Sequence, residues 1–155
     1  MPAHPLLVFH TYVYCSVSGS YVSVLPPVRG GAFAGMLGST RAAALRLYAK
    51  LEADARFLTA FPPELDIVVW APRAACASDA SRLSRLIFAE AARRDLHLAL
   101  AELPATFFDL EGAGIERDRD TLTCLRSVLM KPEHLAWVDQ IWMLLDQATS
   151  AAGES

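Results

Sequence analysis

Apolar residues recur along the chain with two spacings, one typical of strands and one typical of helices. Five stretches rich in valine, leucine and aromatic side chains predict strands, at residues 6–15, 21–25, 66–70, 96–100 and 121–130. The third is the clearest, because Ile67-Val68-Val69-Trp70 is continuously apolar and Pro72 ends it. In the fourth, strict alternation places His97 and Ala99 on one face of the strand.

Helical spacing of apolar residues predicts the other elements. Four helices are expected, at residues 32–38, 41–55, 78–94 and 133–147. Glycine weakens the first, and Ser39 or Thr40 is the expected N-cap of the second. Residues 109–120 are polar and contain glycine, which predicts a hairpin-like connection, and residues 149–155 are expected to be a disordered tail.

The order of these elements predicts an α+β fold. We expect a two-layer sandwich, in which a mostly antiparallel sheet carries helices on one face. The other face of such a sheet is left to solvent or to a partner. Residues 1–148 are interpreted as a single domain, with residues 1–31 contributing strands and an Arg/Gly loop.

Composition limits the classes of function. The chain has 155 residues, of which 54% are hydrophobic, so it is long enough for one domain and indicates either a large core or a surface that meets a partner. Its formal net charge of −3, with acidic and basic residues interspersed, argues against a nucleic-acid partner. No run of apolar residues reaches the ~20 that a membrane helix needs. Residues 6–17 make a poor signal peptide, since no lysine or arginine precedes them.

The cysteines and histidines predict neither a metal site nor a catalytic site. Cys15, Cys76 and Cys124 are far apart in the chain, so each is interpreted as a small buried thiol in a reducing compartment, the cytoplasm. His10 and His97 lie in predicted strands and are expected in the core or at an interface. No nucleotide-binding, zinc-protease or serine-hydrolase motif is present. Residues 29–31, Arg-Gly-Gly, are consistent with a tight turn or an anion-binding loop.

Arg126 is the candidate site residue. It lies in an otherwise apolar run, residues 123–130, where burial of an unpaired guanidinium would be costly. A carboxylate is therefore expected beside it, because the arginine fork binds carboxylates through two parallel hydrogen bonds. The sequence leaves two sources open, an acidic residue of the protein or a ligand.

Several segments, taken in order, resemble the C-terminal part of the pyridoxal-phosphate-dependent group II amino-acid decarboxylases. The resemblance rests on Ala55-Arg56-Phe57, residues 63–70, residues 125–134 and residues 137–142, with a weaker likeness at residues 29–32. It implies the small C-terminal domain of the fold-type-I architecture. It also implies that Arg126, in the Leu-Arg pair of its strand, faces the active site and binds a substrate carboxylate.

The resemblance also implies what this chain lacks. The family's cofactor lysine lies beside a histidine in a large domain, and neither Lys50 nor Lys131 has that context. Pyridoxal phosphate is thus expected in the full-length family, with none bound covalently by this chain. The expected partner is a large cofactor-binding domain or a second subunit, in a homo-oligomer, and the expected reaction is loss of carbon dioxide from Cα. The alternative is a non-catalytic α+β module that binds a partner or associates with itself.

Overall fold

The computed structural model describes residues 29–154. A long helix, α1 (Ala32–Ala53), leads into two strands, β1 (Phe57–Thr59) and β2 (Ile67–Pro72). Helix α2 (Ala77–Ala92) and strand β3 (Ala99–Pro104) follow. A 3-10 helix, η1 (Ala105–Phe107), and a loop then lead to β4 (Thr121–Val128) and the last helix, α3 (His134–Gly153).

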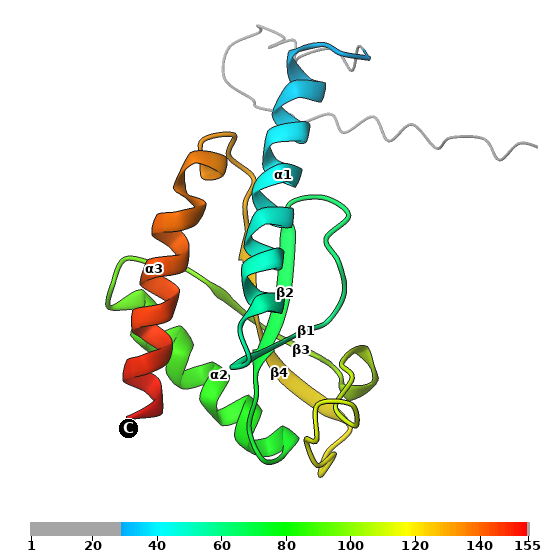
Figure 1. Ribbon diagram of the computed structural model, residues 1–155, viewed down its shortest axis with the longest axis vertical. Helices are drawn as coiled ribbons and strands as arrows, with labels where there is room; N and C mark the ends of the chain where they lie inside the picture. The colour runs from blue at the N-terminus through cyan, green and yellow to red at the C-terminus, as the bar shows by residue number, and fades with distance from the viewer. Residues whose placement is uncertain (1–28, 155) are drawn as a thin grey trace, which may run out of the picture.

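The four strands form one open sheet in the order β1-β2-β4-β3, and every neighbouring pair is antiparallel. The three α-helices gather on one side of this sheet, with α1 and α3 side by side (Figure 1). The predicted α+β two-layer sandwich is thereby confirmed. The loop between β3 and β4 makes the hairpin-like connection that the polar residues 109–120 predict.

The main core lies between the sheet and the helices. Val68, Trp70 and Leu125 project from the two inner strands into it, and Trp70 and Leu125 have no exposed surface. Residues of all three α-helices surround them, including Leu47, Ile87 and Leu145. A second, smaller apolar cluster includes Val69, Leu122 and Cys124, which alternate with the core residues along their strands, and residues of the loop after β3.

Helix α1 corrects the prediction of two helices separated near residue 39. Ser39 and Thr40 lie inside α1, where their hydroxyls donate to the carbonyl oxygens of Gly35 and Leu37, at 3.2 and 3.1 Å, instead of accepting from the backbone as caps. Gly35 does not interrupt the helix either. The cost of a glycine, ~1 kcal/mol relative to alanine, is small beside the burial of the apolar side chains that anchor the second half of α1.

Two further boundaries differ from the prediction. Strand β3 begins at Ala99, because the chain turns at Asp95 with a positive φ of 58° and Leu96 then packs into the core. His97 is therefore exposed, so a position in the core is wrong for it, and its expected place at an interface stays a prediction. Helix α3 continues to Gly153, so the expectation of a disordered tail at residues 149–155 is wrong for residues 149–153. The strands expected at residues 6–15 and 21–25, together with His10 and Cys15, lie outside the described residues.

Candidate functional site

Arg126 projects from the face of the sheet that the three α-helices leave uncovered. Its neighbour Leu125 points into the main core, and the alternation of a strand sends Arg126 to the other side, opposite Val69 and Ala99. We call this side the second face. Its strand positions are Leu58, Ile67, Val69, Ala71, Ala99, Ala101, Leu103, Leu122, Cys124, Arg126 and Val128. Arg126 is the one charged residue among these strand positions.

The expected burial of Arg126 is wrong, because its side chain is exposed. Within residues 29–154 it makes no hydrogen bond or ion pair, so the internal carboxylate partner that burial would require is not found there. Its cross-strand and along-strand neighbours are all apolar or small. The arrangement is a positive charge on an apolar surface, with all five guanidinium N–H donors free for an anion from outside the described chain.

Cys124 lies two residues before Arg126 on the same face and is buried. Its thiol donates to the carbonyl oxygen of Ala101 at 3.4 Å. Burial raises the pKa of Cys124 to about 11, and the nearby Arg126 charge opposes this only in part. The thiol therefore stays protonated near neutral pH and is no nucleophile, in agreement with its interpretation as a structural residue.

Part of the second face is covered by the chain itself. The loop after β3 places Phe108, Leu110 and Ile115 in the second apolar cluster. Phe61 and Phe107 meet edge-on, with ring centroids 6.1 Å apart, yet both remain about half exposed. Ile67, diagonal to Arg126 across β2 and β4, is 40% exposed. Of the apolar side chains next to Arg126, Ile67 thus remains accessible, whereas Val69 and Cys124 are buried.

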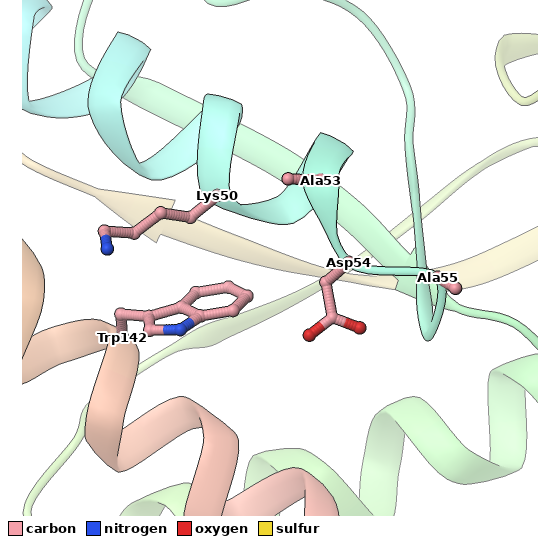
Figure 2. Close-up of a pocket in the computed structure, with 5 residues that line it drawn as sticks. All are labelled: Lys50, Ala53, Asp54, Ala55 and Trp142. Carbon is pink, nitrogen blue, oxygen red and sulfur yellow. The ribbon is translucent and has the colours of Figure 1, made fainter.

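A separate depression of about 410 Å³ lies on the helix side of the molecule. Its lining residues are Lys50, Ala53, Asp54, Ala55 and Trp142, and Figure 2 shows the Lys50 and Asp54 side chains on either side of the Trp142 ring. The Lys50 ammonium lies 5.9 Å from the centroid of that ring and 3.0 Å from a carboxylate oxygen of Asp139. Since α1 and α3 pack on the opposite face from Arg126, the depression and Arg126 belong to different sites.

Neither lysine is placed as a cofactor lysine. The ammonium of Lys50 is engaged by Asp139. Lys131 is exposed in the turn after β4, where its backbone N–H donates to Nδ1 of His134 at 3.4 Å. The lysines present thus do not fit a covalently held pyridoxal phosphate. Within the part of the chain that the structure describes, no cluster of histidine, cysteine and acidic side chains is arranged to hold a metal ion.

The three tryptophans and Gly30 have different surroundings in the structure. Trp70 is fully buried, and Trp142 packs edge-on against Phe57, so both tryptophans are packing residues. Trp137, by contrast, is 48% exposed. Gly30, with a positive φ of 76°, forms a tight turn before α1, which favours the turn over the anion loop.

The Asp54 carboxylate, which lines the depression, contributes to stability in a way that depends on pH. The Arg56 guanidinium holds the pKa of Asp54 below its ordinary value, with a closest contact of 2.7 Å. A lowered native pKa contributes stability above the unfolded-state value of ~3.9, and this contribution is lost as the pH falls through the native value. We therefore expect Asp54→Asn to lower the free energy of unfolding by ~1 kcal/mol at pH 7 and to flatten its fall below about pH 4. Urea unfolding between pH 3 and pH 7 measures both effects.

Asp120→Asn is the control for this prediction, because that carboxylate pairs with Arg117 at 3.0 Å yet its side chain is 96% exposed. It should change neither the stability at pH 7 nor its pH dependence by more than a few tenths of a kcal/mol. Equal acid sensitivity in the wild type and in Asp54→Asn would contradict the assignment.

Comparisons of the chain with family models, with curated proteins and with solved structures give no match.

Among the described helices, none combines the length and apolar character needed to cross a membrane.

Proposed function

We propose that this chain is the C-terminal domain of a pyridoxal-phosphate-dependent amino-acid decarboxylase-like protein, inactive alone, and that Arg126 binds a substrate carboxylate. The proposal rests mainly on the surroundings of Arg126. Its guanidinium is exposed on the second face, next to apolar side chains, and has no partner in residues 29–154. A bidentate arginine–carboxylate pair is favoured in such surroundings once a second surface excludes water.

The second face supports a site that is completed by another polypeptide. Arg126 is flanked by Val69 and Ala99 on the neighbouring strands, and Ile67 remains partly exposed beside it. A charged group beside exposed apolar side chains is consistent with a contact between domains or subunits. The partner in the proposal is the large cofactor-binding domain or a second subunit of a cytoplasmic homo-oligomer.

In the proposed enzyme, this chain binds the substrate carboxylate and the partner binds the cofactor. Arg126 would hold and orient the carboxylate of the amino acid, and the apolar neighbours would exclude water from that contact. The cofactor would be held by the partner, since Lys50 is engaged by Asp139 and Lys131 lies in an exposed turn. When bound there, pyridoxal phosphate supplies an electron sink for the carbanion left by loss of carbon dioxide.

Addition of pyridoxal phosphate to the isolated chain tests the cofactor part of the proposal. We expect no absorbance band in the near-visible range that survives gel filtration, because neither lysine lies in a site that would hold the cofactor. Lys50→Met and Lys131→Met should give the same spectrum as the wild type. A retained band that disappears in one of these two variants would show a cofactor lysine in this chain and overturn the proposal.

The alternative function is self-association without catalysis, and the apolar second face favours it. Pairing of this face with a second copy would bring two Arg126 side chains into one interface, where their like charges oppose binding. Arg126→Leu should therefore increase self-association. The free energy of unfolding of the monomeric variant should stay within ~0.5 kcal/mol of that of the wild type. Size-exclusion chromatography with light scattering measures the change. A monodisperse monomer for both proteins would count against this alternative.

A further inference from the structure

The depression over Trp142 lies between two groups of charged side chains that join α1 and the turn after it to α3. Asp139, Trp142 and Asp146 are spaced three and four residues apart on α3, so they share one face of that helix. This face meets the end of α1, where Lys50 and Asp54 line the depression on either side of the indole ring (Figure 2). The floor is thus aromatic, and the two charged walls have opposite signs.

The wall at Lys50 carries an excess of positive charge. Asp139 accepts from Arg46 at 2.5 Å and from Lys50 at 3.0 Å, so two cations share one carboxylate. No other carboxylate in residues 29–154 pairs with either cation. One positive charge is therefore left without a counter-charge, and Lys50 is the cation of this group that lines the depression.

The wall at Asp54 carries an excess of negative charge. Arg56 pairs with Asp54 at 2.7 Å and with Asp146 at 2.6 Å, so two carboxylates share one guanidinium. Within the described chain, neither carboxylate has an ion pair with another basic residue. One negative charge is left over, and Asp54 is the carboxylate that lines the depression.

We propose that this depression binds a small dipolar molecule, with its anionic end at Lys50, its cationic end at Asp54 and its apolar stem on the Trp142 ring. The ligand class is an amino acid whose ammonium and carboxylate groups are separated by a methylene chain. Each end meets the charge that its wall has in excess, and the stem covers an indole face that is only partly buried. This site lies on the opposite side of the sheet from Arg126 and does not depend on the proposed decarboxylase function.

Titration of the 15N-labelled full chain tests this site, with the indole N–H signal of Trp142 as the readout. That signal is identified by its absence in Trp142→Phe. The probes are glycine, 4-aminobutanoate and 6-aminohexanoate, with butanoate and butylammonium as single-charge analogues. We expect saturable shifts with at least one of the two longer amino acids, at an affinity about three- to fivefold above both analogues, the range of one exposed ion pair.

Two variants separate the two walls without changing a lining side chain. Arg46→Gln leaves Lys50 and Asp139 balanced, so the longer amino acid should bind no better than butylammonium. Asp146→Asn leaves Asp54 and Arg56 balanced, so the longer amino acid should bind no better than butanoate. Arg46 and Asp146 are about half exposed, and neither substitution should disturb the fold. Lys131→Met is the control and should bind as the wild type does.

Three results would overturn the proposal. The first is the absence of a saturable shift of the Trp142 signal with every probe. The second is equal affinity for the longer amino acids and for butanoate or butylammonium. The third is an unchanged affinity for the longer amino acid in both Arg46→Gln and Asp146→Asn, because the excess charges would then have no part in binding.

Discussion

Trp70→Ala is expected to lower the free energy of unfolding by ~3–5 kcal/mol, which is a large part of the ~5–15 kcal/mol that holds a typical domain folded. Trp70 lies on β2, an inner strand, and has no exposed surface. Its indole contacts the main core formed by the sheet and the three α-helices. Removal of this side chain leaves a cavity that the surrounding strands and helices cannot close. Urea unfolding at pH 7, followed by circular dichroism, measures the loss.

Two other tryptophan variants make this prediction specific. The indole N–H of Trp70 is buried and has no hydrogen-bond partner among the described residues. Trp70→Phe keeps an aromatic ring and removes that unpaired donor, so it should cost less than ~1.5 kcal/mol. Trp137→Ala, at a side chain that is 48% exposed, should change the stability by no more than ~0.5 kcal/mol. A loss below ~1.5 kcal/mol for Trp70→Ala would contradict the described core.

The second large effect is expected at Arg126. A bidentate pair between its guanidinium and a substrate carboxylate is worth ~1.5–3 kcal/mol, so Arg126→Leu should lower kcat/KM about 10- to 100-fold in the completed enzyme. Arg126→Lys keeps the charge but loses the planar fork, and it should recover only part of this loss. Because Arg126 has no partner in residues 29–154, the isolated chain should fold as well with leucine at this position.

The sheet and its helices could be predicted from local pattern. The run Ile67-Val68-Val69-Trp70 and the following Pro72 identify β2, and the apolar run through residue 130 identifies β4. Strand β1, with three residues, has no periodic signal of its own. It is a strand because its partner β2 lies beside it, which is tertiary information.

The continuity of α1 and the exposure of Arg126 could not be predicted, because both depend on tertiary contacts. Gly35 and Gly38 are poor helix residues, yet α1 runs through them because the second half of the helix is anchored in the core. Arg126 looks buried in the sequence because its neighbours along the strand are apolar. It is exposed because the three α-helices cover only the opposite face of the sheet.

The charged groups around Trp142 could be predicted only in part. The spacing of Asp139, Trp142 and Asp146 already indicates that they share one helix face. Arg46 lies 93 positions before Asp139, and Arg56 lies 90 positions before Asp146, so only the packing of α1 and the turn after it on α3 brings these partners together. The excess of opposite charges at the two walls follows from that packing.

Release of carbon dioxide from a completed enzyme tests the central claim most directly. The chain is mixed with pyridoxal phosphate and the large-domain partner, taken as the product of a neighbouring reading frame with a His-Lys pair after an apolar strand. The twenty amino acids are then assayed with wild type, Arg126→Leu and the exposed-arginine control Arg82→Leu. We predict release from at least one amino acid, lost about 10- to 100-fold in kcat/KM with Arg126→Leu and unchanged with Arg82→Leu. No release from any amino acid, or equal activity of Arg126→Leu and the wild type, would contradict the proposal.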